Sequence, residues 1–284
     1  MISCAADVSI RPHLLSRFLR ANTKDGVTTL LPDFLPSQLP PRDSIQDRWL
    51  WDSEEWRKQR GGLPSCLVIA TEGPVFSSGH DLSEMKGKPK EEIKEIFDLC
   101  SEVMSLIRRS PSVVISRING IATAAGAQLA ATTDIVIASP SSSFGTPGVR
   151  VGLYCTTPGV AVARAFPPKT AFGMLATART LSAKEAHEKG MVTFLSKVEG
   201  EGEVHALDQL VHDVALDITS SGSQIQALGK WSFYTQIGMR EGGGDGMEAA
   251  VKWAGEIMAR NAKLDDAKEG FSAFLEKRKP SWKT

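Results

Sequence analysis

Apolar residues recur along this chain with two different periods. Cys66–Thr71, Val113–Ile118 and Asp134–Ser139 are short, mostly apolar runs, which is the pattern of strands buried on both faces. Between the first two runs, from residue 91 to 110, apolar residues recur every three or four positions, and this spacing predicts an amphipathic helix. The alternation of strands with helices predicts an α/β fold in which the strands pair largely in parallel.

Helix boundary signals predict a mainly helical second half. A helix is expected around Gly126–Thr132. Thr157 before Pro158 resembles an N-cap followed by a first-turn proline. Ser182–Glu185 matches a capping box, and Gly190 is expected to end the helix that follows.

The C-terminal part also shows helical spacing. Residues 204–218 and 247–258 each place apolar side chains on one face, and Gly242–Gly244 between them is expected to form a loop. The sequence therefore predicts a helical region after the strands.

The first 65 residues show no clear helical or strand periodicity. Residues 1–22 contain three arginines between apolar residues and one acidic residue, a composition typical of a mitochondrial transit segment, with an ordinary surface helix as the alternative. We leave these residues out of the predicted fold. Gly26–Leu31 could form a strand, but the prolines in Pro32–Arg42 interrupt regular structure. Trp49 and Trp56 are expected to be packing residues.

The charge balance and the cysteine spacing limit which classes of binding partner the sequence predicts. The 33 basic residues balance the 33 acidic residues, so the chain lacks the basic surface typical of nucleic-acid-binding proteins. No segment approaches the length of about 18 apolar residues needed for a membrane helix. The four cysteines have no metal-ligand spacing, and we expect reduced thiols and no metal site.

Two glycine-containing loops carry the candidate chemistry. Glu72–Leu82 and Asn119–Leu129 each follow a predicted strand, and we expect them to face each other. Glycine lets a ligand approach the backbone closely, so the N–H groups of His80 and Ala125 could converge on one oxygen. Such a pair forms an oxyanion hole for a carbonyl that gains negative charge. The alternative is that both loops are simply turns.

The two loops, together with further motifs, resemble those of the crotonase (enoyl-CoA hydratase/isomerase) family. The resemblance rests on Phe76–Leu82, Asn119–Gly126 with Asp134 and Ile135, Phe144–Pro147, Leu181–Ala186 with Gly190, and the tail Phe271–Pro280. It implies a spiral of ββα units with a C-terminal helical trimerisation region. We accordingly expect a core over residues 23–215, atypical at 23–65, and a helical region over residues 216–284.

The resemblance also implies a ligand and an assembly. An acyl-CoA thioester would place its carbonyl between the N–H groups of His80 and Ala125, and coenzyme A would be part of the substrate, so no separate cofactor is expected. The implied substrate-binding residues are Ser78, Gly79, Asp81, Leu82, Thr123, Gly126, Phe274 and Lys277. The family further implies a homotrimer or hexamer. A mitochondrial matrix location is expected, with a cytoplasmic location as the alternative.

The acid–base groups of the family's hydratases are missing. Their two glutamates fall at Gln128 and Gly148, which have no usable acid or base. General acid–base catalysis contributes about a hundred- to ten-thousandfold per group, so standard hydration is not expected. Three hypotheses remain: an acyl-CoA enzyme with another reaction of lyase or isomerase type, a catalytically silent acyl-CoA-binding or regulatory paralogue, and a structural partner in mixed trimers.

Other residues could supply the missing chemistry. The candidates are the His80 imidazole, Asp81, Glu84, Tyr154, Cys155 as a nucleophile, and Gln128 as a group that orients water. Cys155 is more readily explained as a packed thiol. A serine hydrolase is disfavoured because the chain has no GxSxG motif. The family's opening Asn-Pro and Asn-Ala-Leu motif, which helps to seat coenzyme A, is absent from Pro32–Arg42.

Overall fold

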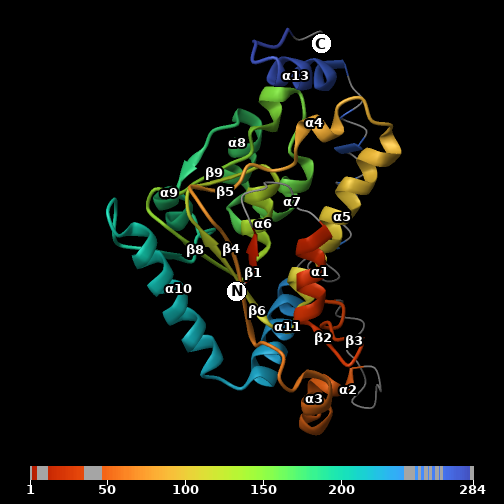
Figure 1. Ribbon diagram of the computed structural model, residues 1–284, viewed down its shortest axis with the longest axis vertical. Coiled ribbons are helices and arrows are strands. Elements are labelled where there is room, and N and C mark those ends of the chain that lie inside the picture. The colour runs from red at the N-terminus through yellow and green to blue at the C-terminus, as the bar shows by residue number, and fades with distance from the viewer. Residues whose placement is uncertain are drawn as a thin grey trace.

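Two β-sheets lie at the centre of the protein (Figure 1). The computed structural model describes residues 2–4, 12–34, 47–239, 247–248, 251–252, 255, 258–259, 262 and 265–281. The expected loop at Gly242–Gly244, most of Pro32–Arg42 and parts of the expected helix over residues 247–258 lie outside these residues. Within the described part of the chain, no helix is both long and apolar enough to cross a membrane.

The strands divide between the sheets in a regular way. The first sheet has the order β1-β4-β6-β8-β11, all parallel, with β1 (Ile2–Cys4), β4 (Cys66–Thr71), β6 (Val113–Ile118), β8 (Ile135–Ala138) and β11 (Phe194–Leu195). The second has the order β10-β9-β7-β5, with β5 (Val75–Ser77), β7 (Ile121–Thr123), β9 (Ser143–Gly145) and β10 (Leu181–Ser182), of which β10 is antiparallel. The predicted parallel pairing is confirmed.

Successive strands alternate between the sheets and are followed by helices. The strands β4 and β5 lead into α4 (Leu82–Met85) and α5 (Lys90–Arg109), and β6 and β7 lead into α6 (Ala125–Thr132). The next pair, β8 and β9, leads into the 3₁₀ helix η2 (Pro147–Val151) and α7 (Thr156–Ala165). This repetition confirms the expected spiral of ββα units.

Among the described residues, the helices after α7 include α8 (Pro168–Thr177), α9 (Ala183–Glu188), α10 (Glu203–Thr219), α11 (Ser223–Met239) and α13 (Asp265–Leu275). The capping box at Ser182 and Glu185 is confirmed by both reciprocal hydrogen bonds. Helix α10 buries Leu207 and Val211 against the first sheet. The boundary expected between residues 215 and 216 falls inside α10, so one continuous helix joins the core to the C-terminal region.

Helix α7 begins earlier than predicted. Its N-cap is Cys155 and its first helical residue is Thr156, and the Gly159 N–H closes the first turn on the Cys155 carbonyl at 2.9 Å. The prediction that Thr157 is the N-cap is therefore wrong. Proline is tolerated throughout the first turn, so Pro158 could not fix the boundary to one residue.

The N-terminal residues are part of the core. Helix α1 (Pro12–Ala21) buries Leu14 and Phe18 at 2% and 1% exposure in the main hydrophobic cluster. Helix α1, which lies within the residues 1–22 that we left out of the predicted fold, thus contributes to the packing of the core. The strand expected over Gly26–Leu31 is limited to β3 (Val27–Thr28), which pairs with β2 (Thr23–Lys24) in a hairpin.

A second cluster joins the N-terminal segment to α11. Helices α2 (Arg48–Trp51) and α3 (Ser53–Arg60) bring Trp49 and Trp56 together, with stacked rings 5.6 Å apart between centroids. These rings pack with Trp231 and Tyr234 of α11. The prediction that Trp49 and Trp56 are packing residues is confirmed.

A buried ion pair ties α11 to the first sheet. The Lys230 ammonium lies 2.7 Å from a carboxylate oxygen of Asp134 and also donates to the carbonyls of Ile107 and Ser112, each at 3.1 Å. The same carboxylate accepts from the Val114 N–H at 2.8 Å, and its other oxygen accepts from the Tyr234 hydroxyl at 2.9 Å. Burial lowers the pKa of Lys230, and the Asp134 carboxylate opposes this shift.

Replacement of this lysine should be costly. Lys230→Met would leave the Asp134 carboxylate buried without its cation, so we expect a loss of about 3–5 kcal/mol in the free energy of unfolding, measured by urea titration. Lys94→Met is the control, because the Lys94–Asp98 pair is exposed and such pairs contribute about 1 kcal/mol or less. Equal, small losses in both variants would contradict the structural role of the buried pair.

Candidate functional site

Two neighbouring strands position the candidate loops. Strands β5 and β7 pair in parallel, so the loops that follow them leave the same edge of the second sheet. The β5 loop runs from Ser78 to Asp81, and the β7 loop passes through Ala124 into α6. The parallel register therefore brings two segments more than forty residues apart to one place.

The two loops touch through their backbones. Gly79 has a φ of +101°, and a Cβ added there would lie 2.8 Å from the Ala124 Cβ and 3.3 Å from the Ala125 nitrogen. A Cβ on Gly126 would lie 2.4 Å from the Ser77 carbonyl oxygen. Any larger residue at either glycine would push the loops apart, so glycine is needed at both positions for close approach.

The backbone donors expected at this contact are unpaired. Within the described residues, neither the His80 N–H nor the Ala125 N–H donates a hydrogen bond. Ala124 has a φ of +51°, a strained value for alanine, and its own N–H donates to the Gly145 carbonyl at 2.9 Å. Helix α6 has no side-chain cap, so the first N–H of the helix stays available.

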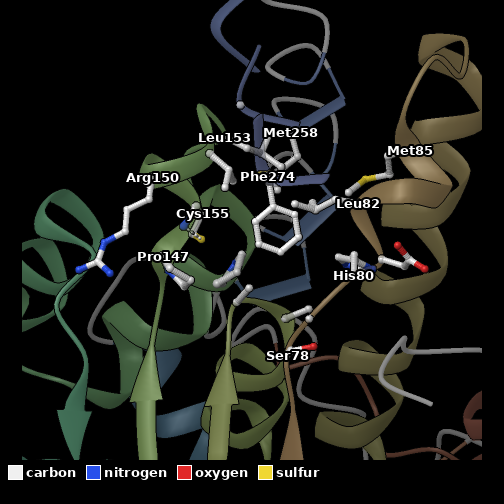
Figure 2. A pocket seen from close by; sticks show the side chains of 18 of the residues that line it. Ser78, His80, Leu82, Met85, Pro147, Arg150, Leu153, Cys155, Met258 and Phe274 are labelled. Carbon is white, nitrogen blue, oxygen red and sulfur yellow. Dashed lines mark hydrogen bonds between the residues drawn. The ribbon is translucent and has the colours of Figure 1, made fainter. Parts of the chain in front are cut away.

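A cavity of about 650 Å³ adjoins the loop contact. Figure 2 shows Cys155 and Pro147 on one side, His80, Leu82 and Met85 on the other, and the Phe274 ring between them. The cavity is lined by Ser78, Gly79, His80, Asp81, Leu82, Met85, Phe97, Ala124, Ala125, Pro147, Gly148, Arg150, Val151, Leu153, Cys155, Thr157, Pro158, Met258, Gly270, Ala273, Phe274, Arg278 and Pro280. It is of a size that accommodates a small organic ligand.

Most of the residues predicted for the site line this cavity. They are Ser78, Gly79, His80, Asp81, Leu82, Ala125, Gly148 and Phe274. Thr123, Gly126, Gln128 and Lys277 are outside the lining. Gln128 is fully buried in α6, and neither atom of its amide has a hydrogen-bond partner among the described residues. Lys277 is exposed beyond the end of α13.

Gly148 forms part of the cavity wall through its backbone alone. A Cβ there would lie 2.0 Å from the Leu153 carbonyl oxygen and 2.7 Å from Cys155 Sγ. The Gly148 N–H donates to this sulfur at 3.3 Å. The chain between Pro147 and Cys155 therefore folds back too tightly for any side chain at position 148.

The side chains near the loops are poorly suited to proton transfer at neutral pH. Burial raises the pKa of Cys155 to about 11, which keeps the thiol protonated. Burial lowers the pKa of His80 to about 4, which keeps the imidazole neutral, and His80 Nε2 has no hydrogen-bond partner among the described residues. The Asp81 carboxylate caps α4 by accepting from the Ser83 N–H and hydroxyl. Glu84 and Tyr154 do not line the cavity.

Several lining residues could not be found from sequence. Phe97 was expected on the buried face of a helix, and its ring packs edge-on against His80 with centroids 5.2 Å apart. Helix α13 packs against η2 and forms one side of the cavity. A Cβ on Gly270 of α13 would lie 1.9 Å from the carbonyl oxygen of Val151 in η2. No local sequence pattern predicts the close contact between Gly270 and Val151, since this glycine lies within a helical segment.

The fold and the paired loops match a known family. The family model for enoyl-CoA hydratase/isomerase proteins matches residues 65–284. The chain therefore belongs to the enoyl-CoA hydratase/isomerase family, the crotonase family. The match begins after the N-terminal segment that packs on α11.

Individual relatives agree with this assignment. The chain is similar to enoyl-CoA hydratase domain-containing protein 3, mitochondrial, from Homo sapiens, with 46% identity over 217 residues, which cover 76% of this chain and 68% of that protein. A crystal structure of the human protein shares 43% identity with a TM-score of 0.58, covering 77% of this chain and 82% of that one. An enoyl-CoA hydratase structure from Mycobacterium smegmatis shares 37% identity with a TM-score of 0.59, covering 84% and 87%. From Glu72–Leu82, Ala122–Gln128 and the ending at Lys277–Trp282, the sequence alone predicts a resemblance to the first of these proteins, and the identity confirms it.

The buried imidazole should make stability depend on pH. The pKa of His80 is about 4 in the folded protein and about 6.5 when unfolded. Between these values the unfolded chain binds a proton that the folded chain does not, so the free energy of unfolding falls as pH is lowered from 7 to 4. Because His80 as a whole residue is only half-buried, we expect it to contribute about 2 kcal/mol to this fall.

The contribution can be isolated with variants. Urea midpoints measured at pH 7 and pH 4.5 should show a smaller pH dependence for His80→Gln than for the wild-type protein. His205→Gln, which changes an exposed residue of α10, should behave like the wild type. An unchanged pH dependence in His80→Gln would show that the imidazole is not buried in its neutral form.

Proposed function

We propose that this protein binds an acyl-CoA thioester and holds the thioester carbonyl oxygen between the N–H groups of His80 and Ala125. The observation that carries this proposal is the pair of unpaired N–H groups beside a cavity. Two fixed donors stabilise the negative charge that develops on the oxygen when the thioester becomes an enolate. A donor pair of this kind needs no reorganisation when the charge appears.

The choice of ligand follows from the family. Relatives are named enoyl-CoA hydratases, which supports an acyl-CoA ligand and a place in fatty-acid or lipid metabolism. Coenzyme A enters as part of that ligand, so the proposed function needs no separate cofactor. Relatives from Rattus norvegicus and Homo sapiens are named mitochondrial, which supports a mitochondrial location. We extend this to the matrix and to a homotrimer or hexamer as part of the proposal.

Standard hydration is not part of the proposal. The hydratase glutamates would correspond to Gln128 and Gly148. Gln128 is buried away from the cavity lining, and the space beside Gly148 is filled by Leu153 and Cys155. Each acid or base group contributes about a hundred- to ten-thousandfold to such a reaction, so loss of both should leave little hydratase activity. The enolate would have to serve another reaction of lyase or isomerase type.

A second function remains in competition: a catalytically inactive acyl-CoA-binding or regulatory paralogue. It is favoured by the side chains that line the cavity. The His80 imidazole, whose pKa is about 4, is a weak base, and the Cys155 thiol, whose pKa is about 11, is a weak acid and a poor nucleophile at neutral pH. Both functions share the binding site and differ only in turnover.

Separating the two loops should weaken binding. Gly79→Ala places a methyl group 2.8 Å from the Ala124 Cβ, so we expect acyl-CoA affinity, measured by calorimetry with a panel of short acyl-CoAs, to fall at least about tenfold. Gly73→Ala is the matched control, because Gly73 also has a positive φ, +84°, but a Cβ there meets nothing within 4 Å. Failure of the wild-type protein to bind any acyl-CoA would refute the proposed ligand. Equal effects of the two variants would refute the proposed carbonyl position.

Restoring one glutamate should not restore hydration. In Gly148→Glu the new Cβ would collide with the Leu153 carbonyl, so we expect a lower melting temperature and no gain in hydration of crotonyl-CoA, followed by loss of the enoyl absorbance. Chromatography coupled to mass spectrometry of an acyl-CoA panel with the wild-type protein then separates the two functions, since only an enzyme converts its ligand into a product of different mass or, for an isomerisation, of different retention time. Hydration by the wild-type protein at the rate of ordinary hydratases would contradict the account of both missing glutamates.

A further inference from the structure

The N-terminus of α7 forms part of the cavity wall. Cys155, Thr157 and Pro158, which begin this helix of ten residues, all line the cavity. Helix α7 has no acidic residue in its first turn and no side-chain cap. The positive end of its dipole is therefore not compensated by an acidic residue of the helix's own first turn.

A count of the hydrogen bonds in the first turn leaves one residue unsatisfied. The Thr156 N–H donates to the Tyr154 carbonyl at 2.7 Å, the Gly159 N–H donates to the Cys155 carbonyl at 2.9 Å, and Pro158 has no N–H. The Thr157 N–H has no acceptor within the described part of the chain. The Thr157 side chain is 2% exposed, and its hydroxyl also has no hydrogen-bond partner there.

Such a residue requires an explanation. Buried polar groups are nearly always hydrogen-bonded, and each one left unpaired costs about 1–3 kcal/mol. Threonine near a helix start commonly satisfies a backbone N–H by capping, but Thr157 lies inside the helix and caps nothing. Two buried donors of one residue thus face a cavity that the proposed function assigns to a ligand.

The charges around the cavity favour an acceptor that is anionic. The Asp81 carboxylate is engaged by Ser83, and the Arg278 guanidinium is paired with Glu269 and Glu276. The exposed guanidinium of Arg150 extends away from the cavity centre (Figure 2). Among the described lining residues, the negative charge of Asp81 stands against the positive charges of Arg150 and Arg278.

We propose that Thr157 anchors a carboxylate, so that the cavity accepts an acyl thioester whose acyl chain ends in a carboxylate, that is, a monothioester of a dicarboxylic acid. One carboxylate oxygen would accept from the Thr157 N–H and the other from its hydroxyl, at the positive end of α7. Hydrogen bonds to an ionised acceptor are about twice as strong as neutral ones, and a helix N-terminus binds anions through the same N–H groups. This inference rests on the proposed function, because the His80 and Ala125 donors would hold the thioester end of the same ligand.

The test compares ligands of equal shape and different charge. Malonyl-CoA and glutaryl-CoA are titrated by calorimetry against 3-methylbutanoyl-CoA and 5-methylhexanoyl-CoA, in which an isopropyl group replaces the carboxylate. We expect at least one carboxylated ligand to bind about tenfold more tightly than its neutral counterpart, which corresponds to one charge-assisted hydrogen bond. Thr157→Val, which replaces the hydroxyl with a methyl group, should remove most of this preference without weakening the neutral ligands.

The control lies in the same turn. The Thr156 hydroxyl donates to the Tyr154 carbonyl at 3.3 Å and does not line the cavity, so Thr156→Val should keep the preference for the carboxylated ligand. The unliganded Thr157→Val protein should be as stable as the wild type, because an unpaired hydroxyl is removed. A marked loss of stability would overturn the inference by showing that the hydroxyl has a structural partner.

Two further outcomes distinguish the two proposals. If the carboxylated and neutral ligands bind equally well, or if Thr157→Val retains the preference, the carboxylate site is refuted and the thioester site stands. If none of the four acyl-CoAs binds to the wild-type protein, the acyl-CoA-binding function itself is refuted, together with the inference that rests on it.

Discussion

The close approach of two backbone segments is the constraint on which the proposed site depends. Parallel pairing of β5 with β7 brings the segment after Ser77 beside the start of α6. The absence of a Cβ at Gly79 and at Gly126 then allows the segments to touch. Ala124 is held at a positive φ by the same contact, a strain of about 1–3 kcal/mol that the surrounding sheet must support. In the proposed function, this contact is what gives the N–H groups of His80 and Ala125 a common target.

The cavity beside this contact offers many donors and few bases. Among the described residues, its unpaired donors include the N–H groups of His80 and Ala125 and the two donor groups of Thr157. The titratable side chains that could move a proton are held neutral by burial, His80 as the free base and Cys155 as the thiol. Position 148 has no room for a carboxylate. The family scaffold for an enolate is thus combined with a lining that differs from that of a hydratase, and the reaction or binding role must follow from the donors.

Much of this arrangement could be predicted from the sequence, because it depends on local signals. The apolar runs that form β4 and β6 and the capping box at Ser182 were read correctly, since each is encoded by neighbouring residues. The glycines of the two loops were found for the same reason. The prediction that Thr157 is the N-cap of α7 was wrong, because a proline in the first turn does not fix which residue is the N-cap.

Features that depend on distant contacts could not be predicted. The packing of α1 on the core, the closure of the cavity by α13 and the burial of Gln128 away from the cavity all depend on tertiary neighbours. The C-terminal tail likewise could not be predicted from local sequence. Lys277 was expected near the ligand, but the turn that ends α13 places Arg278 at the cavity instead. The resemblance to a family supplied the fold of these regions, whereas the side chains at the cavity had to be found in the structure.

The central claim is that two backbone donors polarise a thioester carbonyl, and infrared difference spectroscopy tests it most directly. An acyl-CoA labelled with ¹³C at its thioester carbonyl would be compared free and bound. Donation from the His80 and Ala125 N–H groups should weaken the C=O bond, so the account predicts a carbonyl stretch at lower frequency in the complex than in water. A bound ligand whose carbonyl stretch stays at its frequency in water, or moves to higher frequency, would contradict the account.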